Sequence, residues 1–433
     1  MFFHTRREFL STGLKGAGLL AASAFVPAFI TRTAAAVGAG RDSSILVVVQ
    51  LSGGNDGLNT VVPFRDDLYA KARPTLHLTA NETLPLNDEL GLHPALSSFK
   101  SEFDAGRLAI VQNVGYPNPN RSHFRSMEIW HTGADDTGPR KVEGWLGRYF
   151  DATCAGAQPH ERPGEIGVSI GKVMPQAFRN QSNVGIALSD PNTFQWNPSG
   201  ETSSFAKVQE QIFSKLNQPA PGMSAAGGIT GNEVETIEFL RHTAMNAVVA
   251  GDSIRGILRK EKNRGAYPDS QLASQLQMVA RLISGDFPSR VYYVNQGGYD
   301  THADQLGHHA RLLGDFSGSV SAFLTDLRRQ KTSDRVTVLA FSEFGRRVAE
   351  NGSQGTDHGA AAPMFVIGDS IRGGLHGQAP DLSDLVDGDV RHKIDFRQVY
   401  ASLLDSWLGT PSRPILGEGY EPLPIIGPDR SAV

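Results

Sequence analysis

The sequence predicts an α/β fold in which helices flank a mostly parallel central sheet, and three observations support this prediction. Short apolar runs rich in β-branched residues recur along the chain, as they do in the buried strands of parallel sheets. Segments whose apolar residues have helical spacing alternate with these runs. Several runs also end abruptly in polar residues, and ligand sites in such sheets lie outside the carboxyl ends of the strands.

The predicted strands are short and almost wholly apolar. The first has the sequence ILVVVQL, and β-branched residues of this kind favour extended backbone. The five predicted main strands are Ile45–Leu51, Leu108–Gln112, Val291–Val294, Val336–Phe341 and Met364–Gly368. Each is short enough for a strand of a globular domain, so we expect all five in one sheet.

The predicted helices have apolar residues at helical spacing, which indicates one face packed on the sheet. They are Pro94–Arg107, Asn232–Lys262, Gln271–Ile283, Asp304–Arg329 and Asp395–Leu408, and Pro411 and Pro414 end the last of them. The fourth contains His308 and His309. Because histidine prefers partly exposed positions, we expect both on its solvated face.

The amino-terminal segment has the pattern of a twin-arginine export signal. Arg6 and Arg7 precede an apolar stretch, Leu14–Ile30, and small residues suited to cleavage follow at Thr33–Ala36. Pro27 and the shortness of the stretch argue against a membrane anchor. We therefore expect residues 1–36 to be removed after passage through the twin-arginine translocase, which leaves a periplasmic or secreted protein without a stable membrane span.

The remaining chain is expected to form one α/β domain over residues 43–425. Within it, residues 153–231 are rich in Pro, Gly, Ser, Asn and Gln, which predicts an irregular insertion or cap over the sheet. Short strands are expected inside this insertion at Gly167–Ile170 and Val184–Leu188.

Composition excludes several classes of protein. The formal net charge of −4 lacks the basic footprint of a nucleic-acid-binding protein. Cys154 is the only cysteine, which excludes an intramolecular disulfide and any cysteine-built metal site. The chain has no haem-attachment motif and no dinucleotide fingerprint, so a redox protein ranks last among the candidates.

Polar residues gather at four strand boundaries, which predicts one cluster at the carboxyl edge of the sheet. The candidate residues that bind a metal ion or its water ligands are Asp56, Asp300, His302, Glu343, Asp357 and His358. Asn55 is a candidate for a further hydrogen bond. Carboxylates and imidazoles without thiols suit a divalent cation such as zinc, manganese or calcium. The alternative is that these groups only hydrogen-bond to the backbone of their loops.

Three further residues are candidates for chemistry on a substrate. Ser122 stands where a helix is expected to begin, a position that suits either a plain N-cap or a nucleophile, since helix N-termini favour negative charge. His123 and Arg346 are candidates for steadying an anionic substrate.

Five motifs together carry a resemblance to a known family. The segments LSGGNDGLNT, NRSHF, GGYDTH, SEFGR and NGSQGTDHG, behind a twin-arginine leader, resemble the domain-of-unknown-function family 1501 over nearly all of the mature chain. That family is similar in fold to the alkaline phosphatase and sulfatase superfamily. The resemblance therefore implies an alkaline-phosphatase-like sheet with a divalent-metal site that hydrolyses phosphate or sulfate esters.

The resemblance also implies roles for particular residues. Asp56 matches the first metal-binding aspartate and Ser122 the nucleophile, whereas Asp300 with His302, then Glu343, and then His358 match the later metal motifs. Two departures leave the number of metal ions open: Asp300 and His302 are closer together than in the superfamily, and Phe344 stands where a histidine usually follows the fourth motif.

These considerations predict an exported, metal-dependent hydrolase that acts on a small anionic ester. The alternative is a non-catalytic periplasmic protein for binding or assembly, which keeps the fold but has lost the catalytic metal. Metal content distinguishes the two hypotheses, because only the hydrolase should retain divalent ions on purification.

Overall fold

The computed structural model describes residues 44–134, 142–154, 167–171, 173–181, 185–188 and 250–427. The predicted export signal at 1–36, most of the insertion at 153–231 and the first part of the predicted helix Asn232–Lys262 lie outside the described residues. Within the described residues, no helix is long and apolar enough to span a membrane.

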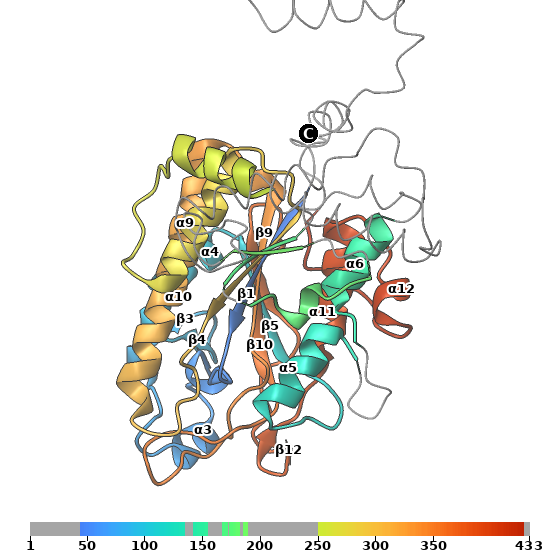
Figure 1. Ribbon diagram of the computed structural model, residues 1–433. Helices are drawn as coiled ribbons and strands as arrows, with labels where there is room; N and C mark the ends of the chain where they lie inside the picture. Colours follow the sequence, from blue (N-terminus) through green and yellow to red (C-terminus); the bar gives the residue numbers. More distant parts are fainter. Residues whose placement is uncertain are drawn as a thin grey trace, which may run out of the picture. The chain divides into compact units, whose positions relative to one another are not determined.

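The main sheet contains nine strands of the described chain and forms the central layer (Figure 1). Its order is β11-β5-β10-β9-β1-β8-β6-β7, and β14 also pairs with β5. The strands are β1 Ile45–Leu51, β5 Leu108–Gly115, β6 Gly167–Ile170, β7 Ile186–Leu188, β8 Val291–Gln296, β9 Val336–Phe341, β10 Ala362–Gly368, β11 Gly374–His376 and β14 Ile394–Asp395. The predicted α/β fold class is confirmed, since the five predicted main strands all belong to this one sheet.

Strand direction brings five chain segments to one edge of the sheet. β1 pairs in parallel with both β8 and β9, whereas β10 is antiparallel to its neighbours β9 and β5. The carboxyl ends of β1, β5, β8 and β9 therefore share an edge with the amino end of β10. This arrangement explains how residues before β10 and residues after the other strands can meet.

The described part of the predicted insertion contributes to the sheet itself. β6 pairs in parallel with β8, and β7 in turn pairs in parallel with β6. These two segments extend the sheet at its end and do not lie over it, so for them the expectation of a cap is wrong. Their apolar side chains are buried in the sheet, which explains why they behave as strands within a polar region.

Helices cover both faces of the sheet (Figure 1). One face packs against α4, α9 and α10, and the other against α5, α6 and α11. The α-helices are α3 Asp67–Ala72, α4 Ser97–Asp104, α5 His123–Thr132, α6 Trp145–Thr153, α9 Gln271–Ser284, α10 Gln305–Gln330, α11 Phe396–Ser402 and α12 Arg413–Leu416, and residues 250–260 are also helical. Two small sheets and several short helical turns complete the regular structure of the described residues. One sheet contains β2 Val61–Val62, β3 Leu84–Pro85 and β4 Gly91–Leu92, and the other contains β12 Leu385–Val386 and β13 Asp389–Val390.

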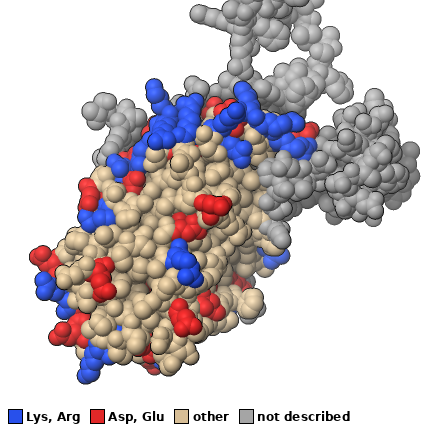
Figure 2. Space-filling view, turned by 90° about the vertical axis from the view of Figure 1, so that its left-hand side faces the viewer, with Lys and Arg blue, Asp and Glu red and all other residues tan. Residues whose placement is uncertain are grey.

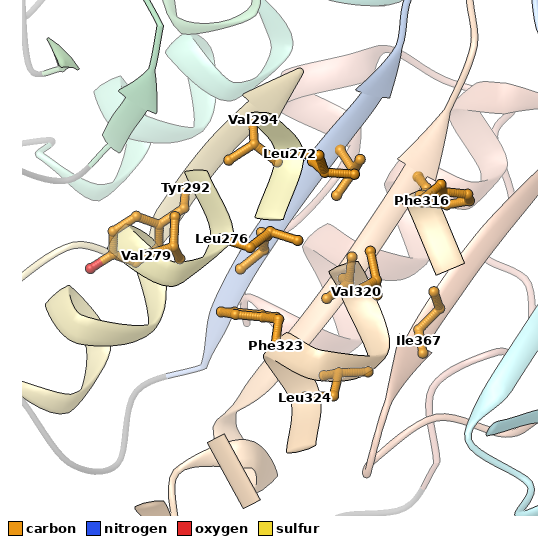
Figure 3. Packing of buried hydrophobic residues seen from close by; sticks show 14 of the residues in the cluster. Leu272, Leu276, Val279, Tyr292, Val294, Phe316, Val320, Phe323, Leu324 and Ile367 are labelled. Atoms are coloured by element: carbon orange, nitrogen blue, oxygen red, sulfur yellow. The ribbon is translucent and has the colours of Figure 1, made fainter. Parts of the chain in front are cut away.

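Alternation along each strand decides which core a side chain joins. In β1, Val47 and Val49 belong to the core under α9 and α10, whereas Leu46 and Val48 belong to the opposite core. Figure 3 shows the first core, in which Leu276 of α9 and Phe323 of α10 pack over the strands. A strand buried on both faces needs apolar residues at every position, which is why these strands appear as continuous apolar runs.

Two predicted helices differ in detail from the structure. The segment predicted as Pro94–Arg107 begins with a 3₁₀ turn, η4 Pro94–Leu96, before α4. The closing helix is α11 followed by a π-helical turn, η8 Leu403–Trp407. Both departures lie at helix ends, where backbone hydrogen bonding is least constrained by the sequence pattern.

The expected exposure of the two histidines of α10 is wrong for one of them. His309 is buried, and its Nε2 lies 2.9 Å from Asn55 Oδ1 in the loop after β1. Burial lowers the pKa of His309 to about 3, so the ring is neutral. His308 is half-buried against the carbonyl of Gly298.

Charged side chains are unevenly spread over the face shown in Figure 2. Lysine and arginine side chains gather near the top of that view, and much of the middle of the face carries no charge. The formal net charge of −4 is a sum over the whole chain and does not reveal this local grouping.

Candidate metal centre

The loops that leave the sheet at its shared edge are locked together by close backbone contacts. Gly53, which follows β1, has φ +121° and donates its N–H to Glu343 Oε1 at 2.9 Å. A Cβ on Gly53 would lie 2.4 Å from the backbone nitrogen of Asp300. Only glycine therefore fits where the loop after β1 crosses the loop after β8.

Three side-chain atoms form a nearly equilateral triangle at this edge. Asp300 Oδ1 lies 3.0 Å from His302 Nε2 and 3.1 Å from His358 Nε2, and the two nitrogens are 3.0 Å apart. A metal with ligand bonds of about 2.1 Å holds its ligand atoms roughly 3.0–3.4 Å apart in octahedral or tetrahedral geometry. The spacing of the triangle thus fits a single metal ion.

The second nitrogen of each ring fixes where its proton must be. His302 Nδ1 lies 3.1 Å from Asp357 Oδ1, and His358 Nδ1 lies 2.8 Å from the carbonyl oxygen of Arg121. Because a carboxylate and a carbonyl only accept hydrogen bonds, both Nδ1 atoms carry a proton. With both rings neutral, the two Nε2 atoms present lone pairs to each other and to Asp300 Oδ1, an arrangement that a proton on one ring or a bound cation would stabilise.

His123 adds a third imidazole of the same kind. Its Nδ1 lies 2.8 Å from Glu343 Oε1, and its Nε2 has no hydrogen-bond partner and lies 3.6 Å from Asp300 Oδ2. Ligand atoms of His123, Asp300 and His358 all lie within 4.8 Å of one another. The hydrogen bond to Glu343 raises the pKa of His123 although partial burial opposes this.

Asp300 is the anionic centre of the cluster. Partial burial would raise its pKa, but hydrogen bonds from Arg346 and His358 outweigh this and lower the pKa to about 2. Its side chain is 48% exposed, so the carboxylate is ionised and open to solvent. The cluster therefore combines one fixed negative charge with imidazole nitrogens, which is a donor set that zinc or manganese accepts.

Glu343 and Asp357, both predicted as metal-binding residues, lie behind the histidines. Glu343 is 2% exposed and accepts hydrogen bonds from His123, from the Gly53 N–H and from the Ser342 hydroxyl. Asp357 orients His302 and is itself held by Asn351 Nδ2 at 3.2 Å. Carboxylates that orient a ligating histidine are a regular feature of metal sites.

The structure does not bring Asp56 into the cluster. Its carboxylate is fully buried in an ion pair with Arg73 at 2.6 Å, and it also accepts hydrogen bonds from Gln305 and from the backbone of Asn59. Burial raises the pKa of Asp56, but Arg73 more than offsets this and lowers it. Asp56 and Asn55, which is paired with His309, therefore hold the loop after β1.

Arg346 also forms hydrogen bonds within the loops, and no part of its side chain is exposed. It donates to the carbonyls of Gly53, Gly54, Tyr299 and Thr356 and to Asp300 Oδ1 at 2.7 Å. These hydrogen bonds hold three loops together, and the buried side chain cannot reach a substrate.

Ser122 occupies the N-cap position of α5, where a plain N-cap is one of the two interpretations. Its side chain, however, makes no cap hydrogen bond. The residue is exposed and stands next to His123. The hydroxyl is thus unused at a helix N-terminus beside the metal cluster.

Several residues that support the site were not predicted from the sequence. Arg73 and His309 come from segments with no polar motif, and only the fold places them against the loop after β1. Asn351 occurs in the predicted motif NGSQGTDHG, where an Asn-Gly pair indicates a turn and gives no sign of a partner.

A cleft of about 560 Å³ opens beside the cluster. His123, Asp300 and Glu343 line it together with residues of α5 and of the end of β1. Concave sites of this size hold small molecules, so the cluster faces a space that a substrate can enter.

Comparisons with known proteins place these observations in a family. No curated protein matches the chain. Among solved structures, the chain is similar to a protein in the alkaline phosphatase superfamily from Vibrio parahaemolyticus, with 9% identity, 87% of this chain and 69% of that chain covered and a TM-score of 0.36.

Two further solved structures are enzymes by their descriptions. The PsFucS1 sulfatase from Pseudoalteromonas sp. is 10% identical, with 92% of this chain and 73% of that chain covered and a TM-score of 0.34. The phosphonate monoester hydrolase of Agrobacterium radiobacter is 11% identical, with 87% and 77% covered and a TM-score of 0.32. The family model for "Protein of unknown function (DUF1501)" matches residues 43–407, which is most of the chain and confirms the resemblance of the five motifs. The chain therefore belongs to the DUF1501 family.

Proposed function

We propose that this protein is an exported, metal-dependent hydrolase of phosphate or sulfate esters. The observation that carries the proposal is the convergence of His302 Nε2 and His358 Nε2 on Asp300 Oδ1, with 3.0 to 3.1 Å between each pair of these atoms. This arrangement favours a bound divalent cation over a set of loop hydrogen bonds. The export signal at 1–36 and the periplasmic or secreted location are part of the proposal.

The proposed ligands are Asp300, His302 and His358, with His123 completing the set. Each histidine uses Nδ1 for an acceptor behind it and turns Nε2 to the site. A divalent ion bound there would polarise an ester oxygen or lower the pKa of bound water to about 7. Asp56, Glu343 and Asp357 have supporting roles in this proposal, which assigns one ion to the site.

Ser122 and Arg346 have different roles in this proposal. Ser122 is the proposed nucleophile, because its hydroxyl makes no cap bond and the positive end of the α5 dipole favours the developing negative charge. In the first step the Ser122 oxygen bonds to phosphorus or sulfur while the bond to the ester oxygen breaks, and the alcohol leaves with the serine proton. In the second step one water breaks the bond to Ser122, which restores the hydroxyl and releases the free anion. Arg346 keeps Asp300 ionised and in place throughout.

Elemental analysis of the purified full chain tests the proposal directly. We expect about one divalent ion per chain in the wild type and a loss of the ion in His302→Ala and His358→Ala. His376→Ala is a matched control, because His376 is bonded only to the carbonyl of Arg372. A wild-type protein that stays folded and binds no zinc, manganese or calcium would favour the non-catalytic alternative.

Activity is then measured on the metal-loaded protein with a panel of phosphate and sulfate monoesters. Turnover that disappears in Ser122→Ala, while the metal content stays unchanged, supports the assigned nucleophile. A metal-loaded protein that hydrolyses no ester contradicts the catalytic part of the proposal but leaves the metal site intact.

A further inference from the structure

The cleft beside the metal cluster has two chemically different walls. Helix α5 contributes His123, Phe124, Met127 and His131 to its lining, and the end of β1 contributes Gln50 and Ser52. Phe124 and Met127 form an apolar wall, whereas Gln50, Ser52 and His131 form a neutral polar wall.

The charge of the cleft restricts what can bind beside the metal. Among the described residues that line it there is no lysine or arginine, whereas Glu128, Asp300 and Glu343 are present. These carboxylates have cationic or histidine partners of their own, so the lining offers no cationic side chain to pair with an alcohol part that carries further negative charge, such as a nucleotide. The lining favours an ester whose alcohol part is uncharged.

The apolar wall is an aromatic ring presented to solvent. Phe124 is 92% exposed in the first turn of α5, and Met127 follows it one helical turn later on the same face. An exposed phenylalanine contributes little to the stability of the fold because it is not buried. At the rim of a cleft it offers a flat surface against which a ring of a ligand can stack.

The polar wall has an unused donor. Ser52 Oγ accepts hydrogen bonds from Gln50 Nε2 at 2.6 Å and from Asn295 Nδ2 at 2.5 Å. Both neighbours are amide donors, so the hydroxyl hydrogen of Ser52 is left free to donate to a third group.

The polar wall also has an unused acceptor. His131 Nε2 lies 3.1 Å from Gln50 Oε1 and 3.0 Å from the hydroxyl of Tyr293, which itself donates to Gln50 Oε1. Since the amide oxygen only accepts, the proton of the neutral ring is on Nε2 and Nδ1 is an acceptor. Burial lowers the pKa of His131 to about 4, in agreement with a neutral ring.

We propose that the alcohol part of the ester is a neutral sugar ring, which stacks one face on Phe124 and places hydroxyl groups against Ser52 and His131. Sugar hydroxyls both donate and accept, so they can pair with the Ser52 hydroxyl and with His131 Nδ1, whereas an aliphatic alcohol leaves these groups unpaired. This inference rests on the proposed hydrolase function and specifies the substrate class of the same site.

Binding of sugars is measured first, without turnover. Saturation-transfer NMR with methyl glucoside, methyl galactoside and methyl fucoside should show contact with the metal-loaded full chain. The signal should weaken strongly in Phe124→Ala and in Ser52→Ala and persist in Leu306→Ala, a control with an exposed leucine that does not line the cleft. Absence of any sugar signal in the wild type overturns the inference, whatever the protein hydrolyses.

Turnover provides the second test, with sugar monosulfates and monophosphates compared with ethyl sulfate, ethyl phosphate and nucleoside monophosphates. We expect kcat/KM for the best sugar ester to exceed that for the ethyl ester by at least about tenfold, and Phe124→Ala to raise KM for the sugar ester about three- to tenfold, as a lost stacking contact does. A preference for nucleotides, or an equal effect of Phe124→Ala on every ester, overturns the sugar assignment. If no ester is hydrolysed, the hydrolase proposal fails and the NMR result alone decides whether the cleft binds sugars.

Discussion

His302 and His358 point their Nε2 atoms at each other across 3.0 Å, although each ring already uses its Nδ1 proton for a different acceptor. Two lone pairs at this distance repel unless a positive charge lies between them. Asp300 Oδ1 faces both nitrogens, which places a carboxylate where it would neutralise that charge. This relationship supports the proposed metal site and gives rise to the first prediction.

Asp357→Ala should weaken metal binding without abolishing it. Asp357 orients His302 through Nδ1, and loss of such a supporting carboxylate lowers metal affinity by about 10- to 100-fold. Competition with a chelator of known affinity measures the change. Asp381→Ala serves as control, because Asp381 accepts hydrogen bonds from Ser383 in a different loop. Equal affinities of Asp357→Ala and wild type would contradict the supporting role.

Asp56→Asn should destabilise the fold and leave the metal ligands unchanged. The substitution leaves Arg73 buried without its counter-charge, and breaking a buried ion pair in this way costs about 3–5 kcal/mol. Denaturant unfolding gives the free energy, and elemental analysis at low temperature gives the metal content. The matched surface change is Asp104→Asn, whose pair with Lys100 is 58% exposed on the aspartate side and is worth about 0–1 kcal/mol. A stable Asp56→Asn protein that lacks metal would instead make Asp56 a ligand.

Ser122→Ala separates the two interpretations of this residue. Because the side chain makes no cap hydrogen bond, we expect the free energy of unfolding to change by less than about 0.5 kcal/mol, whereas loss of a true N-cap costs about 1 kcal/mol. Ester turnover should fall steeply at unchanged metal content. A clear loss of stability with turnover intact would identify Ser122 as a plain cap.

Gly53→Ala should disturb the metal cluster through the backbone. The added Cβ would collide with the backbone of Asp300, and a φ of +121° is strained for any other residue. We expect lower stability and lower metal occupancy, measured by thermal unfolding and elemental analysis. Gly297→Ala is the control, since a Cβ there meets no atom within 4 Å. Equal behaviour of the two variants would show that the crossing of the loops is less tight than described.

Glu102 should make the stability of the fold depend on pH in mildly acidic solution. Burial raises its pKa, but hydrogen bonds from Arg328 and Arg107 outweigh this, so the pKa in the folded state is lower than the usual 4.5. A lowered folded pKa gives stability that is present above pH 4.5 and is lost as the pH falls through the folded value. Unfolding measured from pH 6 downward should show a smaller acid-induced loss in Glu102→Gln than in wild type. Parallel curves for the two proteins would contradict this contribution.

The sequence by itself determined the strands and the positions at which polar residues leave them. Val336–Phe341 and Ile45–Leu51 are apolar at every position, which identifies strands buried on both faces before any contact is known. Because parallel strands end at a common edge, Asp300 and His302 could be assigned to that edge from their places in the chain, whereas His358 reaches it because β10 is antiparallel to β9, which only the structure showed. The polar strand ends and the family resemblance both predicted a metal site, but both also assigned Asp56 and Glu343 to it, whereas the structure pairs Asp56 with Arg73 and Glu343 with His123.

Only the tertiary structure decided the partner of each polar side chain. Asp56 follows β1 just as Asp300 follows β8, yet Asp56 is buried against Arg73 and Asp300 is open to solvent among imidazoles. His309 likewise lies on a helix whose spacing gives no sign of its burial against Asn55. The physical reason is that local sequence sets backbone conformation, whereas the role of a charge depends on its desolvation and on counter-charges that distant segments bring within a few ångströms.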